Sequence, residues 1–340
     1  MLIFSIFIIS FLICIIFTFI YKDFAKKYGP LSIPNNRTLH NSPIPVGGGL
    51  AIIISCFTGI IMTFEMGYLS KEQFYIFGIG SLLTGLVGVL DERINIRPCY
   101  QLGTQFLSAF YTFVALGFYT KINEQVSINF LALLTIFIIL FLIIWIYNAF
   151  NFVDGCDGMA SSCIIFITFP MIIIFESLGY EDLVLLLTVL LASNIGFLFF
   201  NKPSAQIFMG DSGTKYISFF LVAVILESLQ REPKLVFVWI TIASFYLVDT
   251  TLTTFTRFLT VPRFWEGHRT HAYQNLVQIW NSHKKVLKLT LLVNLLWCMP
   301  LGLLSYSNIN YAQYICIIAL IPLAIYSYKF GPRFHVQNNK

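Results

Sequence analysis

Polar residues recur at intervals of three in the middle of the chain. They are Asn148, Asn151, Asp154 and Asp157, and a glycine follows each aspartate. Hydrophobic stretches flank the segment, and polar groups so close to lipid are costly to place. Amides and carboxylates in series suit sugar hydroxyls, a uracil edge or metal-bound water. A 3₁₀ turn would stack the four side chains in a row, whereas an α-helix would fan them around its axis. A turn alone needs fewer polar groups, so the segment predicts a ligand-binding site.

A second acidic group, Asp91-Glu92, follows another hydrophobic stretch and precedes Arg93. Adjacent carboxylates at a helix C-terminus meet the unfavourable end of the helix dipole, so a cation or an arginine should offset them. A divalent metal held together with substrate phosphates is one such offset. A solvated pair in a loop is the alternative.

Asp211 directly follows Gly210 at the start of a further hydrophobic stretch. A carboxylate in this position either holds Mg²⁺ or caps the helix. Its role stays open between the two.

The segment before the second hydrophobic stretch contains Arg37, His40 and three consecutive glycines, 47–49. Glycines at a helix entrance let the backbone approach a ligand closely, and helix N-termini favour anions. A tight helix start with ordinary basic anchoring is the alternative.

The segment 262–271 holds His268, Arg269 and His271. As cations, these three side chains could grip a diphosphate. No third ligand lies at a spacing suited to zinc, and anchoring at the membrane interface is the alternative. Asp249, in the preceding hydrophobic stretch, is expected to pair with a neighbour or to face the cleft.

Hydrophobic helices must position these polar segments. Of the 340 residues, 57% are hydrophobic and 11% are charged. Soluble domains carry about 25% charged residues, and a membrane-spanning helix needs about 20 apolar residues. The sequence therefore predicts an all-α polytopic membrane protein, a single domain over 1–340. Its eleven expected spans are about 2–21, 46–64, 74–90, 101–120, 130–147, 158–176, 182–200, 213–230, 234–256, 286–306 and 310–328.

Lysine and arginine set the orientation. If residues 22–45 are cytoplasmic, all basic residues except Lys71, Lys121, Arg231 and Lys234 fall on that side. The positive-inside rule then places the N-terminus outside and the C-terminus inside. The outward loops carry scattered glutamates without pattern, so we expect a cytoplasmic active-site cleft. The inward loops are about 22–45, 91–100, 148–157, 201–212 and 257–285.

Together these segments resemble the polyprenyl-phosphate N-acetylhexosamine-1-phosphate transferase family, which includes phospho-N-acetylmuramoyl-pentapeptide transferase. The likeness covers about residues 22–275 and preserves the order of the motifs. Its most specific parts are N-x-x-N-x-x-D-G-x-D-G at 148–158 and F-M-G-D-S-G at 208–213. The resemblance implies ten or eleven transmembrane helices, a UDP-linked N-acetylhexosamine as donor and polyprenyl (undecaprenyl) phosphate as acceptor. It also implies release of UMP and a Mg²⁺ cofactor, for which Mn²⁺ can substitute.

The resemblance also assigns roles to individual residues. The catalytic candidates are Asp91, Glu92, His268 and His271. The candidate metal ligands are Asp211 and Asp154. The candidates for substrate binding are Asn148, Asn151, Asp157, Asn201, Phe208, Arg37, His40 and Arg269. Among these, Asn201 and Phe208 look like uridine contacts, Phe208 by stacking.

Two departures narrow the resemblance. The family's Asp-Asp pair is Asp91-Glu92 here, which leaves the role of Glu92 open. The histidine loop reads His-Arg-Thr-His rather than three consecutive histidines. The chain therefore looks less like the peptidoglycan enzyme that makes lipid I, which stays an alternative. It looks more like members that initiate O-antigen, lipopolysaccharide or another surface polysaccharide, some of which use UDP-FucNAc or UDP-QuiNAc.

The resemblance implies a protein of the bacterial inner membrane without a nucleic-acid partner, and it leaves the oligomeric state open, a homodimer included. A cation-coupled transporter is the alternative from a different class. That function would need carboxylates near the bilayer midplane and polar groups reachable from both faces.

Overall fold

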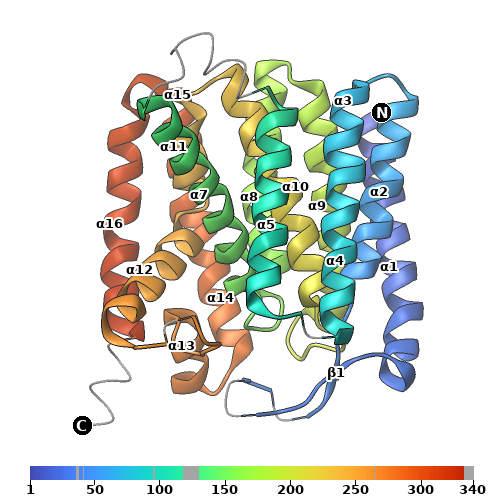
Figure 1. Ribbon diagram of the computed structural model, residues 1–340, viewed down its shortest axis with the longest axis vertical. Helices are drawn as coiled ribbons and strands as arrows, with labels where there is room; N and C mark the ends of the chain where they lie inside the picture. Colours follow the sequence, from blue (N-terminus) through green and yellow to red (C-terminus); the bar gives the residue numbers. More distant parts are fainter. Residues whose placement is uncertain (36–37, 41, 95, 118–129, 264, 333–340) are drawn as a thin grey trace.

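A computed structural model describes residues 1–340 except 36–37, 41, 95, 118–129, 264 and 333–340; the side chains of residues 131–132 are also not described. Its helices run side by side in one bundle, and the first helix begins at the opposite end from that at which the last one finishes (Figure 1). The expected all-α, multi-pass membrane fold is confirmed.

The helices have the following bounds in chain order. They are α1 (Leu2–Tyr28), α2 (Gly49–Glu65), α3 (Lys71–Gln73), the π-helix η1 (Phe74–Gly80), α4 (Ser81–Ile94), α5 (Pro98–Ala115), α7 (Phe130–Val153), α8 (Met159–Leu178), α9 (Glu181–Asn201), α10 (Gly210–Arg231), α11 (Leu235–Ile242), α12 (Ser244–Thr260), α13 (Ala272–Trp280), α14 (His283–Val293), the π-helix η2 (Asn294–Cys298), α15 (Met299–Ser307), the 3₁₀-helix η3 (Ile309–Tyr311) and α16 (Ala312–Phe330).

The expected count of eleven spans is not confirmed. Within the described residues, eight helical segments are long and apolar enough to cross a bilayer, and α11 with α12 makes a ninth span. That ninth span was expected to be one helix over 234–256, but it bends by 78°. The break falls at Ala243, whose backbone (φ −85°, ψ 3°) leaves the helical region. The other two expected spans correspond to α2, which has only 17 residues, and α5, which is too polar for its length.

The centre of the bundle consists of α8, α9 and α10. In the apolar windows of α9 and α10, 78% of the residues are buried, compared with 22% in α1 and α16. The outer helices therefore present apolar side chains to lipid, while α10 packs on α2, α4 and α7. This central position matters because α10 begins with the candidate ligand Asp211.

A small sheet and α13 cover the inward end of the bundle (Figure 1). The strands β1 (Leu31–Ser32) and β2 (Ile44–Pro45) pair antiparallel, with Leu31 opposite Pro45. The sheet lies in the first inward loop and returns the chain toward α2.

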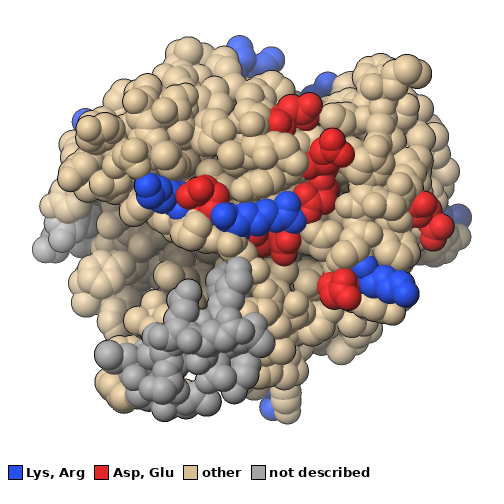
Figure 2. Space-filling view, turned by 90° about the horizontal axis from the view of Figure 1, so that it is seen from above, with Lys and Arg blue, Asp and Glu red and all other residues tan. Residues whose placement is uncertain are grey.

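Charged residues at the outward end form an ordered network. Arg231 Nη1 donates to Asp182 Oδ1 at 2.8 Å, and Arg231 Nη2 donates to Glu227 Oε1 at 2.7 Å. Gln73 Nε2 donates to the other oxygen of Asp182 at 2.6 Å. Figure 2, which views this end from above, shows acidic and basic side chains adjoining one another. The network joins α3, α9 and α10, and its acidic members Asp182 and Glu227 belong to helices expected as spans and not to the outward loops.

We expect Asp182→Ala to lower the free energy of unfolding by roughly 2 kcal/mol, because charge-assisted hydrogen bonds to Arg231 and Gln73 are lost. The measurement is thermal unfolding of the purified protein in detergent. Glu65→Ala, at an exposed position of the same end, is the matched control. Equal melting temperatures for the two variants would show that the network does not stabilise the bundle.

Candidate active site

Two glycines bring α2 and α4 against the first turn of α10. A Cβ atom on Gly49 would overlap the backbone of Gly213, and one on Gly88 would overlap the backbone of Asp211. Only glycine permits so close an approach, so the inward ends of three helices meet at one point. Asp91 lies one turn beyond Gly88 on α4, and the same approach carries its carboxylate to Asp211.

Lys215 joins Asp91 and Asp211. Its ammonium forms an ion pair with Asp91 Oδ2 and lies 3.9 Å from Asp211 Oδ2. Asp91 is only 3% exposed, and its Oδ1 accepts a hydrogen bond from the backbone N–H of Ile96 at 2.8 Å. The carboxyl groups of Asp91 and Asp211 are also within hydrogen-bonding reach of each other. Because a buried charge is stable only when it is paired, Lys215 is part of the site.

Glu92 caps α10 from outside that helix. Its Oε1 accepts a hydrogen bond at 2.8 Å from the backbone N–H of Ser212, the third residue of α10. The residue at the N-cap position, Met209, offers no capping side chain. A carboxylate also interacts favourably with the positive end of the helix dipole. Glu92 is therefore a positioning residue for Asp211, and Asp211 itself is not the cap.

Asp154 lies in the turn between α7 and α8, close to the other carboxylates. Burial, first, and then the negative charges of Asp211, Glu92 and Asp157 together raise the pKa of Asp154 to about 8, against the opposing effect of the Gly210 backbone N–H. Carboxylates that repel one another in this way favour the arrival of a cation. Among the described residues, no three His, Cys, Asp or Glu side chains already lie at the spacing of a metal site.

The first half of the central motif is α-helical, so its side chains point in different directions around the helix axis and are not stacked in a row as in a 3₁₀ turn. Both asparagines belong to α7, and each contacts a different neighbour. Asn148 exchanges hydrogen bonds of 3.0 and 3.3 Å with the amide of Gln105 on α5. Asn151 Oδ1 accepts a hydrogen bond of 3.2 Å from the hydroxyl of Thr214 on α10. The amide of Asn148 thus joins two helices, whereas exposed Asn151 lies beside the carboxylates.

The second half of the motif is fixed to the loop before α10. Asp157 Oδ2 accepts a hydrogen bond from the backbone N–H of Ala205 at 3.1 Å. Asn201 Oδ1 accepts from Gly158 N–H at 3.0 Å, and its Nδ2 donates to the carbonyl of Ile207 at 2.9 Å. Asn201 is 1% exposed, so its amide holds two loops together in this structure.

His283, the first residue of α14, links three segments. Its Nδ1 lies 3.2 Å from Asp157 Oδ1 and 3.4 Å from Cys156 Sγ. Its Nε2 lies 3.1 Å from the carbonyl oxygen of Leu39 in the first inward loop. Nothing in the sequence singled out this histidine, because its partners lie more than one hundred residues away along the chain.

The first inward loop pairs with the loop before α10 through backbone hydrogen bonds. Gly48 N–H donates to the carbonyl of Phe208, and Phe208 N–H donates to the carbonyl of Pro45, both at 2.9 Å. The rings of His40 and Phe208 lie 5.2 Å apart between centroids and are tilted by 54°. Two candidate substrate contacts therefore form one aromatic surface. Arg37, a further candidate in this loop, lies outside the described residues.

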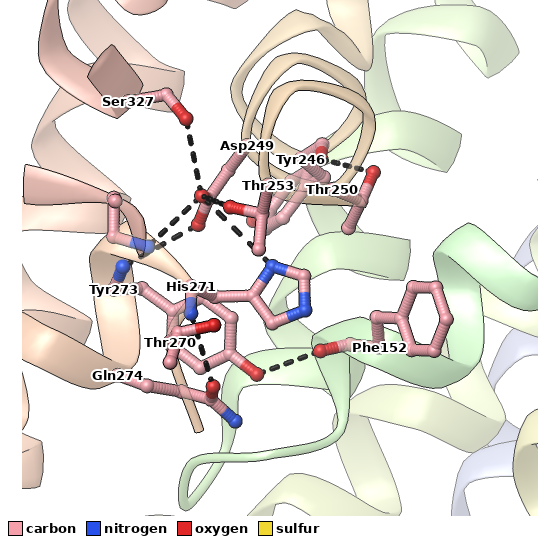
Figure 3. Close-up of polar contacts among 12 residues, drawn as sticks. Phe152, Tyr246, Asp249, Thr250, Thr253, Thr270, His271, Tyr273, Gln274 and Ser327 are labelled. Carbon is pink, nitrogen blue, oxygen red and sulfur yellow. Dashed lines mark hydrogen bonds and ion pairs between the residues drawn. The ribbon is translucent and has the colours of Figure 1, made fainter. Parts of the chain in front are cut away.

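Asp249 holds the histidine loop in place (Figure 3). Its buried carboxylate accepts hydrogen bonds from the backbone N–H groups of Ala272 at 2.9 Å and Tyr273 at 3.3 Å, in the first turn of α13. The hydroxyls of Thr253 and Ser327 lie 3.2 and 3.3 Å from Asp249 Oδ1. The expectation that Asp249 pairs with neighbours is confirmed.

The histidine loop also contacts the other inward loops. The rings of His268 and His271 stack with centroids 5.0 Å apart, and the ring of Phe152 in the central motif lies 6.3 and 5.6 Å from them, respectively. Arg269 Nη1 donates to the carbonyl of Thr38 at 3.2 Å. All five inward segments therefore meet at one end of the bundle.

The two histidines are neutral at pH 7. Burial, together with the nearby guanidinium of Arg257, lowers the pKa of both His268 and His271 to about 3, and His271 also contributes to the lowered pKa of His268. Neutral rings do not support the expectation that His268 and His271 act as cations on a diphosphate, and the assignment of both residues to the site stays a prediction. Of the three candidates in this loop, only Arg269 brings a permanent positive charge.

Lys215 and Gln105, like His283, are residues of the site that were not predicted from the sequence. Lys215 follows Asp211 by four residues, a spacing that places both side chains on one face of a helix. That spacing was the available signal for an ion pair. Gln105 had no comparable signal, because its partner Asn148 is on another helix.

Comparison with known proteins agrees with the motifs. Residues 74–229 match the family model described as glycosyl transferase family 4. A probable undecaprenyl-phosphate N-acetylglucosaminyl 1-phosphate transferase of Bacillus subtilis (strain 168) is 27% identical over 329 residues, which cover 94% of this chain and 89% of that protein. The undecaprenyl-phosphate alpha-N-acetylglucosaminyl 1-phosphate transferase of Escherichia coli (strain K12) is 30% identical, over 65% of this chain and 61% of that protein.

A phospho-N-acetylmuramoyl-pentapeptide-transferase of Streptococcus pneumoniae (strain CGSP14) is 28% identical over 61% of this chain and 65% of its own length. The alignments cover less than two thirds of the length of the Streptococcus pneumoniae transferase and of the Escherichia coli transferase. These matches confirm the family resemblance that the motifs carry.

Glu92 can be tested as a cap. We expect Glu92→Ala to destabilise the protein by about 1 kcal/mol, because Ser212 N–H loses its acceptor. Glu92→Gln keeps an oxygen acceptor and should lose only the interaction between its charge and the helix dipole, so ligand binding at the site should stay within about fivefold of wild type. Thermal unfolding and ligand titration measure the two effects. Equal loss in both variants would contradict the capping role.

His271 should make stability fall at low pH. Its folded-state pKa of about 3 lies below the ordinary value of 6.5, so its contribution is present above pH 6.5 and lost as the pH falls toward 3. The slope approaches about 1.4 kcal/mol per pH unit in that window. We expect His271→Asn to flatten the wild-type curve by this amount, while Tyr273→Phe keeps it. Thermal unfolding between pH 4 and 7 tests this, and identical curves for wild type and His271→Asn would contradict it.

Proposed function

We propose that this protein transfers N-acetylhexosamine 1-phosphate from a UDP-linked sugar to polyprenyl (undecaprenyl) phosphate, giving a polyprenyl diphosphate sugar and UMP. The observation that carries the proposal is the convergence of Asp91, Asp154 and Asp211 at one end of a membrane bundle. Apolar helices offer a lipid acceptor access from the bilayer, and the polar loops offer a nucleotide access from water. The Bacillus subtilis and Escherichia coli relatives are named as undecaprenyl-phosphate transferases, which supports this acceptor class.

The proposed reaction is a phosphoryl transfer at the β-phosphorus of the UDP-sugar. An oxygen of the acceptor phosphate forms a bond to that phosphorus, and the bond from the phosphorus to the oxygen of UMP breaks. The C1–O bond of the sugar stays intact, so its anomeric configuration is retained. The second pKa of a phosphate monoester is about 6, so few acceptor molecules carry a proton at pH 7. Asp91 therefore contributes mainly by orienting the acceptor phosphate, because positioning can supply most of the rate.

The proposal includes Mg²⁺, and the described oxygen donors fit it. Magnesium takes one or two carboxylates together with water and substrate phosphates, so it needs no preformed cluster of three protein ligands. Asp211, with a side chain 38% exposed, and the neighbouring Asp154 are such donors. Bound there, the ion would neutralise charge that develops on the diphosphate. Lys215 meanwhile keeps Asp91 ionised and fixed.

The nucleotide end of the donor is assigned to the aromatic surface of His40 and Phe208. A flat base can stack on such a surface, and Arg269 lies in the adjoining loop with a charge suited to the diphosphate. Neutral His268 and His271 are then left to donate hydrogen bonds or to shape the pocket.

The finer assignment is a multi-pass enzyme of the bacterial inner membrane, with its active site facing the cytoplasm. We propose that it initiates O-antigen, lipopolysaccharide or another surface polysaccharide, as its histidine loop suggests. The hexosamine is to be identified with a panel of UDP-HexNAc donors that includes 6-deoxy sugars.

Asp211→Asn tests the metal assignment. We expect it to reduce UMP release by at least about 100-fold, because a charged group at the developing charge is lost. The measurement is UMP release from UDP-HexNAc by purified enzyme with undecaprenyl phosphate and Mg²⁺. Glu181→Gln, exposed at the outward end, is the control with wild-type activity. Near-normal turnover of Asp211→Asn would refute the assignment.

Isotope exchange separates the proposed enzyme from a transporter. We expect labelled UMP to enter the UDP-sugar only when the acceptor, polyprenyl phosphate, and Mg²⁺ are supplied together. Cation transport into vesicles without such exchange would refute the transferase.

A further inference from the structure

Three exposed lysines lie in the first two turns of α14, at the inward end of the bundle. They are Lys284, Lys285 and Lys288, called the lysine patch below, and α14 begins there beside α13 (Figure 1). Among the described residues, no ion pair involves any of the three. Residues 267–340 contain no Asp or Glu, so this part of the sequence has no acidic side chain to neutralise them. The patch is therefore available to an anion from outside the protein.

The position of the lysine patch on its helix is unfavourable without such an anion. Cations near a helix N-terminus face the positive end of the helix dipole, and like charges one turn apart repel each other. Lys26 and Lys27 are different, because they occupy the last turn of α1, where the dipole favours cations. These two lysines stabilise their own helix, whereas the lysine patch gains stability from an external negative charge.

An apolar stripe continues from the lysine patch toward the middle of the bilayer. Leu292 follows Lys288 by four residues and therefore lies on the same face of the helix. Leu292, Leu295 and Leu296 are 54%, 50% and 69% exposed, so this face of α14 and η2 meets lipid. Trp280, the last residue of α13, is also exposed, and tryptophan is enriched where hydrocarbon meets the headgroups. Cations at one end of an apolar stripe match a membrane lipid with an anionic headgroup.

The depth of the lysine patch agrees with the headgroup layer of the inward leaflet. Lys288 follows the first residue of α14 by five residues, which corresponds to about 7 Å of helix rise. The headgroup layer is about 5–7 Å deep on each side of the hydrocarbon core. A lysine side chain can also extend along apolar surface to bring its ammonium to the interface. All three ammonium groups can therefore reach lipid phosphates.

The opposite face of the same two turns contacts the central motif of the candidate active site. His283 Nδ1 lies 3.2 Å from Asp157 Oδ1, and its Nε2 lies 3.1 Å from the carbonyl oxygen of Leu39. Leu287 is buried, and its Cδ2 atom would lie 3.1 Å from a Cβ atom on Gly158. The start of α14 thus has lysines on its exposed side and active-site loops on its buried side. An interaction that fixes this part of α14 also fixes those contacts.

We propose that the lysine patch binds the phosphate of an anionic phospholipid of the inward leaflet, and that this lipid favours the active arrangement of the central motif. The second part rests on the proposed function. Charge complementarity selects the occupant, because phosphatidylglycerol has a net negative charge and phosphatidylcholine has none. Each basic residue near an anionic leaflet adds to the attraction. The lipid acts on the active site to the extent that it binds more tightly when α14 holds the central motif in place.

Photocrosslinking tests the contact with the lipid. The probe is phosphatidylglycerol with a diazirine near the headgroup end of one acyl chain, used with full-length protein in phosphatidylcholine nanodiscs without UDP-sugar or polyprenyl phosphate. We expect label on residues 280–296, in clear excess over a matched phosphatidylcholine probe. The triple variant Lys284→Gln, Lys285→Gln, Lys288→Gln should remove this excess, because each lysine contributes about fivefold to binding. Equal labelling by the two probes, or an excess that survives in the triple variant, would overturn the proposal.

Activity tests the link between the lipid and the active site. We expect wild type to release UMP about fivefold faster in nanodiscs that contain phosphatidylglycerol than in pure phosphatidylcholine. The triple variant should be equally slow in both. The matched control is Lys26→Gln, Lys27→Gln, Lys202→Gln, which removes the same charge from exposed lysines at the same end and should respond like wild type. Loss of the response in the control as well would overturn the assignment to α14, because total surface charge would then be responsible.

The lipid site and the proposed function fail in different ways. A protein that transfers sugar phosphate equally fast with and without phosphatidylglycerol contradicts the regulatory link alone. A protein that transfers no UDP-HexNAc to any polyprenyl phosphate contradicts the proposed function, and crosslinking still decides whether the lysine patch binds the phospholipid.

Discussion

Mutual repulsion of carboxylates at the start of α10 is the constraint around which the inward end is built. Asp91, Asp154 and Asp211 lie close enough for their charges to interact, and Glu92 stands beside them. Such a cluster costs free energy in a poorly hydrated place. Three features offset the cost: the ammonium of Lys215, the positive end of α10, and backbone N–H groups directed at Asp91 and Glu92. The offset is incomplete, which leaves the site prepared for a further cation or for a substrate that brings one.

The loops that surround this cluster are held by hydrogen bonds between segments that are distant in sequence. The first inward loop is bonded to the loop before α10, and the histidine loop is bonded to both the first loop and the central motif. His283 adds a connection from α14 to two of these loops. A site built this way keeps its polar groups in fixed positions, which favours reactions that depend on alignment. It also explains why polar residues such as Asn201 are needed although they are almost fully buried.

The sequence was sufficient for the fold class, for the gathering of the motifs at one end of the bundle, and for the acidic residues that converge. These follow from local composition and spacing, which a single chain displays directly. Partners across helices do not: Asn148 with Gln105, Glu92 with Ser212 and His283 with Asp157 depend on how the helices pack. The neutral histidines were missed for a similar reason, because burial and the approach of Arg257 arise only in the folded chain. The bend at Ala243 leaves no proline or glycine signal in the sequence, so one straight span was the natural expectation.

The two ends of α10 explain why chemistry is expected at only one of them. Each end carries an acid and a base four residues apart, Asp211 with Lys215 and Glu227 with Arg231. At the outward end, the guanidinium of Arg231 bonds both Glu227 and Asp182, and Gln73 also donates to Asp182, so the polar groups are paired with one another. At the inward end, one ammonium faces a larger group of carboxylates, and Asp211 remains partly exposed. The same local pattern therefore stabilises the bundle where charges are matched, and creates a place for a charged ligand where they are not.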